Sequence, residues 1–102
     1  MKTRNVFAFI AGLVFAAAVQ AQPWPAKPVK FIVPFPPGGA TDISARMIGQ
    51  KLSEMWGQSV VIENRGGAGG GVGAAEAARA IPDGYTLFFP SGSVVTANQH
   101  IY

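Results

Sequence analysis

The sequence predicts an α/β protein whose core is a parallel sheet in a βαβαβ arrangement. Three short runs are rich in β-branched and aromatic residues, as strands are. The two stretches between them have the periodicity or the composition of helices, and each is long enough to connect parallel strands. Because such connections are right-handed, we expect helices on the faces of the sheet.

The predicted strands are residues 29–33, 59–63 and 86–89. The first, VKFIV, is almost continuously apolar, which indicates burial on both faces. It follows a proline-rich stretch, residues 22–28, that we interpret as an extended leader.

The first helix is expected after the turn sequence PFPPGGATD. Thr41 is predicted to be its N-cap, and Asp42 suits the first turn because the helix dipole favours a negative charge there. Gly57 is placed where a C′ glycine ends a helix. Apolar residues at helical spacing mark one face of this helix: Ile43, Met47, Ile48, Leu52, Met55 and Trp56.

The second helix is predicted from the alanine-rich stretch Val72–Ala80, whose small side chains would allow close packing on a sheet. Pro82-Asp83-Gly84 ends it. Residues 94–102 are interpreted as a loop that leads into the start of a helix.

The first 21 residues are typical of a cleavable signal peptide. Lys2 and Arg4 precede an apolar run, residues 6–18, and a small-residue cleavage site follows it. The run is about 13 residues, shorter than the roughly 20 that span a bilayer, which disfavours an uncleaved anchor. We expect cleavage after Ala21 and export to the periplasm.

Charge and cysteine content exclude several classes of function. The chain of 102 residues has 8 basic and 5 acidic residues, but two basic residues lie in the expected signal peptide, which leaves 6 against 5. The remaining basic residues are scattered, unlike a nucleic-acid-binding surface. The chain has no cysteine, which excludes disulfides and thiolate metal sites, and we expect no metal and no cofactor.

Three glycine-containing loops are expected at the carboxyl edge of the sheet: residues 34–40, 64–71 and 90–93. Six of the ten residues from Asn64 to Gly73 are glycine. Ligands of parallel sheets bind at this edge, and two of the loops lead into helix N-termini, which favour anions. We therefore predict that backbone amides hold a carboxylate, while the alternative is that the glycines serve only tight turns and close packing.

Two enzyme classes fit less well. Residues 69–74 match G-x-G-x-x-[GA], but after the second strand and without the acidic residue that binds a ribose. Ser91 lies in PSGS, not in a G-x-S-x-G turn, and His100, the single histidine, lies near the chain end. We do not expect an enzyme.

Long stretches of the sequence resemble one receptor family. The run PAKPVKFIVPFPPGGATD is followed, in order, by ENR, GAGG and PDGYTL. These stretches are similar to the solute-binding receptors of tripartite tricarboxylate transporters, the Bug-type periplasmic proteins. The resemblance implies a type II periplasmic binding protein fold, in which two α/β lobes close on a small carboxylate or dicarboxylate and a membrane permease receives it.

The resemblance also implies ligand contacts that are made largely by the main chain. The residues that match the family's binding loops are Phe35, Gly38, Gly39, Thr41, Ala68, Gly69, Gly70 and Ser91. Asp42 would repel an anionic ligand, so we expect it to orient the first loop instead of contacting the ligand.

Family members are much longer, so we interpret residues 29–102 as an incomplete first lobe. We expect a fragment or a truncated gene of a carboxylate receptor rather than a working minimal receptor. The alternative is a non-functional fragment, or a small exported interaction protein without ligand binding.

Overall fold

The computed structural model describes residues 3, 5, 6, 8 and 22–101. The expected signal peptide and its cleavage site otherwise lie outside the described residues. The elements, in chain order, are β1 (Val29–Val33), α2 (Ala40–Trp56), β2 (Val60–Asn64), the 3-10 turn η1 (Ala68–Gly70), α3 (Gly71–Arg79), β3 (Thr86–Phe88), α4 (Gly92–Thr96) and α5 (Asn98–Ile101).

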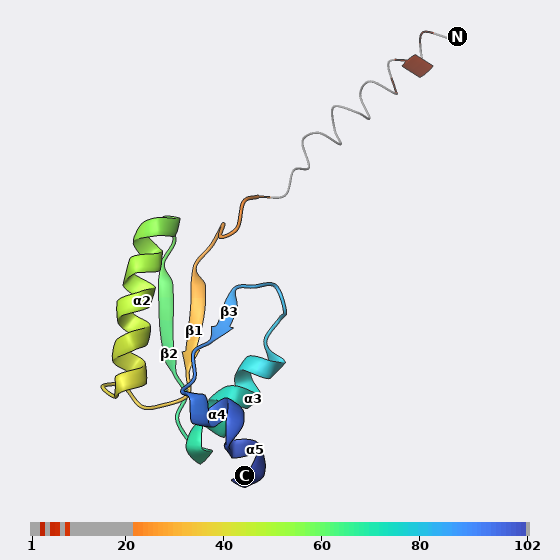
Figure 1. The fold of residues 1–102 in the computed structure, drawn as a ribbon. Helices are drawn as coiled ribbons and strands as arrows, with labels where there is room; N and C mark the ends of the chain where they lie inside the picture. Colours follow the sequence, from red (N-terminus) through yellow and green to blue (C-terminus); the bar gives the residue numbers. More distant parts are fainter. Residues whose placement is uncertain (1–2, 4, 7, 9–21, 102) are drawn as a thin grey trace.

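The three strands form one parallel sheet in the order β2-β1-β3. Val33, the last residue of β1, pairs with Asn64, the last residue of β2. Helix α2 contacts β1 and β2, α3 contacts β1 and β3, and Figure 1 shows the two helices on opposite sides of the sheet. This arrangement confirms the predicted βαβαβ unit.

The central strand β1 carries the core. Val29, Phe31 and Val33 are buried on the α2 side, where they pack with Ala45, and Phe31 stacks on Phe89. Ile32, which points to the opposite side, is also buried. The predicted burial of β1 on both faces is confirmed.

The buried face of α2 differs from the apolar face that helical spacing marks. Only Leu52 and Trp56 of that set pack against the core. The four exposed members, with the exposed fraction of each, are Ile43 (51%), Met47 (69%), Ile48 (45%) and Met55 (68%).

Small residues on the same face as Leu52 and Trp56 bring α2 close to the sheet. Its buried residues are Asp42, Ala45 and Gly49. A Cβ on Gly49 would lie 3.1 Å from Cγ1 of Val60, so the helix and β2 approach closely at this glycine. Closeness of the two backbones, not the largest apolar side chains, therefore decides which face is buried.

The ends of α2 give one confirmed prediction and one correction. Gly57 has a left-handed backbone (φ 67°) and donates its N–H to Ser53 O at 3.0 Å, as expected for a glycine that ends a helix. The N-cap, however, is Gly39, without a side-chain hydrogen bond to the helix. Thr41 lies within the first turn, because the helix starts two residues earlier than the hydroxyl pattern suggests.

Two glycines allow the segment after β2 to pack closely against Pro34, at the carboxyl end of β1. A Cβ on Gly73 would lie 2.8 Å from Cβ and 2.9 Å from Cα of Pro34, and 3.0 Å from Arg65 O. Gly70 has φ +99°, and a Cβ there would lie 2.6 Å from Cγ2 of Val94. Gly70 thus permits a left-handed backbone, and both glycines permit close contact with Pro34, the residue after β1.

The leader, residues 22–28, has no helix or strand and lies against the amino ends of the strands. Trp24 packs edge-on against Trp56, with ring centroids 4.8 Å apart. Tyr85 accepts a hydrogen bond from Ala26 N at its hydroxyl (2.8 Å), and Lys27 Nζ lies 4.5 Å from its ring centroid. Aromatic contacts thus hold the leader in place.

The end of the chain forms the short helices α4 and α5, where a loop and the start of a helix were expected. Asn98 of α5 donates a hydrogen bond to Gly69 O at 2.6 Å. Within the described ranges, no helix has the length and apolarity that a membrane crossing needs.

Replacement of Gly73 by alanine is expected to destabilise the fold by about 1–3 kcal/mol, because the new methyl group meets backbone atoms that cannot move aside cheaply. Gly92→Ala is the matched control: its Cβ would meet nothing within 4 Å, so we expect a change within about 0.5 kcal/mol. Urea unfolding of both variants measures the difference. Equal stability of G73A and the unmodified chain would contradict the close packing against Pro34.

Candidate functional site

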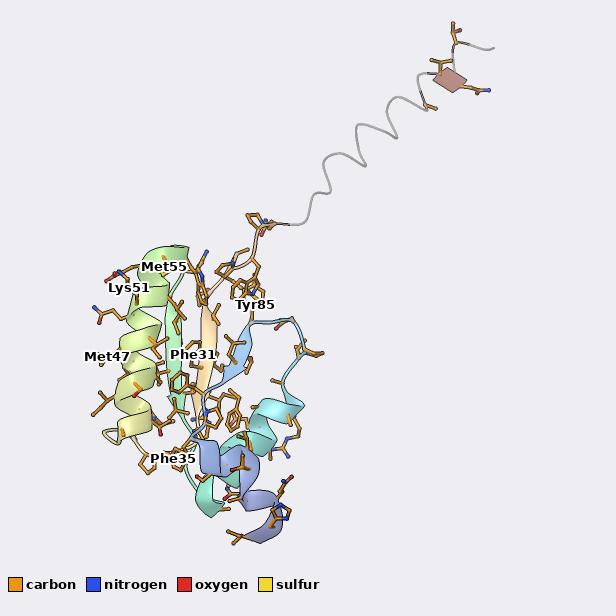
Figure 2. The ribbon with its side chains drawn as sticks, in the orientation of Figure 1. Phe31, Phe35, Met47, Lys51, Met55 and Tyr85 are labelled. Atoms are coloured by element: carbon orange, nitrogen blue, oxygen red, sulfur yellow. The ribbon has the colours of Figure 1, made fainter. Side chains whose placement is uncertain are left out.

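The sheet order places one cleft between the loops that follow β1 and β3. The connection from β1 leads away from β3, to β2 at the other edge of the sheet, and ligands of such sheets bind at the point where the strand order reverses. A cleft of about 390 Å³ lies at this position. Its lining residues are Phe35, Pro36, Pro37, Gly39, Ala40, Thr41 and Ser91. Figure 2 shows Phe35 at the carboxyl end of the strands, opposite to Tyr85.

The N-terminus of α2 supplies the polar groups of the cleft. The first backbone bond of this helix joins Ile43 N to Gly39 O at 2.9 Å. Helix geometry therefore leaves the N–H groups of Ala40, Thr41 and Asp42 without partners inside the helix, and no side chain caps them. These amides and the positive end of the helix dipole favour a negatively charged ligand group at this place.

Asp42 is buried beside the cleft, with 2% of its surface exposed, but it does not line it. Its carboxylate accepts hydrogen bonds from Gly38 N (3.0 Å) and from Nδ2 of Asn64 (2.9 Å). Nε of Arg46 lies 3.0 Å and 3.1 Å from the two carboxylate oxygens. A buried carboxylate needs such partners. Because its oxygens bond to these three groups, the Asp42 carboxylate is not presented to the cleft.

These hydrogen bonds lower the pKa of Asp42 from 3.8 to about 2. The side-chain amide of Asn64 has the largest effect, followed by the amide of Gly38 and the guanidinium of Arg46, while burial acts in the opposite direction. The carboxylate therefore stays ionised at any pH near neutrality, and its bond to Gly38 holds the loop in front of the helix.

The structure gathers some of the predicted site residues and separates others. Phe35, Gly39, Thr41 and Ser91 line the cleft, and Gly38 adjoins it. Residues 68–70, in the second loop, follow β2 and do not line this cleft. Sheet order explains the separation, because β2 lies on the far side of β1 from β3.

Pro36, Pro37 and Ala40, which complete the cleft wall, lie within the first expected loop. Sequence reasoning missed the contacts by which Asn64 and Arg46 hold Asp42. Two patterns could have shown these contacts: Arg46 lies four residues after Asp42 on the same helix, and Asn64 follows Val60 and Ile62 at the two-residue period of one strand face.

The side chains considered for catalysis each contact a nearby polar side chain. Oγ of Ser91 lies 3.0 Å from Oγ of Ser93, and Nε2 of His100 lies 3.3 Å from Nε2 of Gln99. In the part of the chain that the structure describes, no three acidic, histidine or cysteine side chains come close enough to hold a metal ion.

Comparison with known proteins decides the family. The profile of the tripartite tricarboxylate transporter family receptor matches residues 44–102. The chain belongs to this family. It is 48% identical over 89 residues to the protein BugT of Bordetella pertussis, an alignment that covers 87% of this chain and 27% of BugT. The chain spans between a fifth and a third of the length of the curated relatives it matches.

Solved receptors have the same fold over the matched part. A structure described as a periplasmic transporter is 60% identical, with a TM-score of 0.63, over 64% of this chain and 22% of that one. A Rhodopseudomonas palustris protein solved with adipate is 48% identical (TM-score 0.63), with the same coverage. MatC from Rhodopseudomonas palustris with bound malate is 45% identical (TM-score 0.61), again with 64% and 22% covered.

The lowered pKa of Asp42 makes a prediction for acid stability. Since the pKa is about 2 in the folded chain and 3.8 in the unfolded reference, ionised Asp42 stabilises the fold above pH 4 or so, and this contribution is lost as pH falls towards about 2. Unfolding free energies of the unmodified chain and of D42N, measured by urea from about pH 7 to about pH 2, test this. The unmodified chain should lose more stability over that interval than D42N, and parallel curves would contradict the assignment.

Proposed function

We propose that this chain is part of an exported receptor that binds one carboxylate group of a small dicarboxylate in the cleft between the β1 and β3 loops. The observation that carries the proposal is the uncapped N-terminus of α2, which opens into a cleft at the switch point of the sheet. Family membership supports a receptor over an enzyme, because the matching family is one of transporter receptors.

The chemistry of the cleft suits a carboxylate that carries an apolar chain. Partnerless amides of Ala40 and Thr41 can donate to its oxygens, as can the hydroxyls of Thr41 and Ser91. Phe35 and the two prolines beside it form an apolar wall for methylene groups. Among the residues that the structure describes, no lysine or arginine lines the cleft, so hydrogen bonds and the helix dipole take the place of an ion pair.

We assign ligand contact to Phe35, Gly38, Gly39, Thr41 and Ser91. The residues after β2 remain part of the proposed site as a neighbouring loop: Ala68, Gly69 and Gly70. Asp42 orients the first loop through its bond to Gly38 N.

Several wider features belong to the same proposal. We infer export through a signal peptide cleaved after Ala21, transfer of the ligand to a membrane permease, no catalysis and no cofactor. The two related receptors solved with adipate and with malate support dicarboxylates as the ligand class.

Titration of the purified chain with adipate and with malate tests the proposal. We expect saturable shifts of the amide resonances of Gly39, Ala40, Thr41 and Ser91, because these groups line the cleft. Hexanediol and butanediol keep a chain of similar length but lack the carboxylates, and should shift nothing. Equal shifts from diols and diacids would contradict carboxylate recognition.

Thr41→Val keeps the shape of the side chain but removes its hydroxyl. The loss of one hydrogen bond to a charged group should weaken adipate or malate binding by roughly tenfold. The control is Thr96→Val, which removes a hydroxyl that bonds only Gly92 O within its own short helix. Binding that is unchanged in T41V, or equally weakened in T96V, would argue against this role of Thr41.

A further inference from the structure

Asn64 is the one side chain described here that joins the first cleft loop to the buried Asp42. Its Nδ2 group donates to Phe35 O at 3.0 Å and to Oδ1 of Asp42 at 2.9 Å. Its carbonyl oxygen accepts from Nη2 of Arg46 at 3.1 Å. Both amide hydrogens and the oxygen are therefore used, each for a different partner.

The position of Asn64 follows from the sheet. It is the last residue of β2 and pairs with Val33, directly before the loop that carries Phe35. Val60 and Ile62, on the same strand face, pack against the core under α2. Asn64 therefore emerges from β2 at the first turn of α2, where Asp42 lies.

The first cleft loop is held by these polar contacts and by the packing of Pro36 against Gly66. Pro36, Pro37, Gly38 and Gly39 are exposed, and a Cβ on either glycine would meet nothing within 4 Å. Two hydrogen bonds fix the loop to the body of the protein: Asn64 holds the carbonyl of Phe35, and Asp42 holds the amide of Gly38. Asn64 contributes to both, because it also binds Asp42.

We propose that Asn64 is a positioning residue for the cleft, which sets the Phe35–Gly39 loop for ligand capture by holding Phe35 O and the Asp42 carboxylate at once. This inference rests on the proposed function for its ligand, but its structural part is independent of it. Only a neutral amide can serve here: aspartate has the same shape but cannot donate to either oxygen, and it would add a second negative charge beside Asp42.

The chain offers a matched control at the other end of β2. Ser53 Oγ accepts a hydrogen bond from Val60 N (2.9 Å) and donates to Gly49 O (2.8 Å), so it also joins α2 to β2. It is remote from the cleft. Ser53→Ala should therefore lower stability without changing the loop, whereas a positioning role of Asn64 requires a change in the loop itself.

The experiment compares the full chain with N64A, N64D and S53A by two readouts: hydrogen exchange of the Gly38 amide, and the apparent Kd for adipate and malate from amide shifts. We expect the Gly38 amide to exchange faster in N64A and N64D. If the loop then has its binding conformation in about a tenth of the molecules, the apparent Kd should be about tenfold higher. S53A should match the unmodified chain in both readouts. Folded N64A with unchanged exchange and unchanged Kd would overturn the proposal.

Failure of ligand binding and failure of N64A to fold can each be told apart from failure of the positioning role. If the unmodified chain binds neither diacid, the proposed function fails, and Gly38 exchange in N64A alone supports or overturns the positioning role. If N64A does not fold, Arg46→Ala replaces it, since 52% of the Arg46 side chain is exposed and its removal deprives both Asn64 and Asp42 of a partner. Faster Gly38 exchange in R46A then supports the network, and unchanged exchange overturns it.

Discussion

The burial of β1 on both faces is the constraint on which the other elements depend. Because VKFIV has buried apolar residues on both faces, it needs a helix over each face and a strand on each edge. The sheet order β2-β1-β3 and the helices α2 and α3 supply them. Pro34, which follows directly, is the surface against which Gly70 and Gly73 pack. The cleft loop starts from the same residue, so the position of the site is set by the end of the most buried strand.

Much of the fold could be predicted from local sequence, but the buried face of α2 could not. The strands and the glycine after α2 follow from residue type alone. Helical spacing, in contrast, treats Ile43, Met47 and Met55 as core residues, whereas Ala45 and Gly49 face the sheet. The deciding factor is how closely a helix and a strand approach, and this is a property of the pair that neither segment shows by itself.

The loops of the site could be predicted from local sequence, but which of them line the cleft could not. Three glycine loops at one sheet edge were expected, and the structure puts the first and third around the cleft, while the loop after β2 packs under β1. Strand order decides between these outcomes, and no local pattern encodes it. Asn64 was missed because its role requires three partners from separate parts of the chain: Phe35, Asp42 and Arg46.

The charge arrangement explains how an acidic residue can belong to the proposed anion site. Asp42 lies in the first turn of the helix whose amides open into the cleft, yet its carboxylate is enclosed by Gly38, Arg46 and Asn64. The cleft therefore presents backbone N–H groups and hydroxyls without an opposing charge. Recognition of this kind depends on the geometry of the backbone, which is why small shifts of the loop matter.

The contact between Trp24 and Trp56 determines what the tryptophan fluorescence of this chain can report. These are the only tryptophans in the sequence, and they lie together at the amino ends of the strands, where the leader docks. The cleft is at the opposite end, beside Phe35 (Figure 2). Intrinsic tryptophan fluorescence of this chain consequently reports leader docking and unfolding. Ligand binding in the cleft would leave it unchanged.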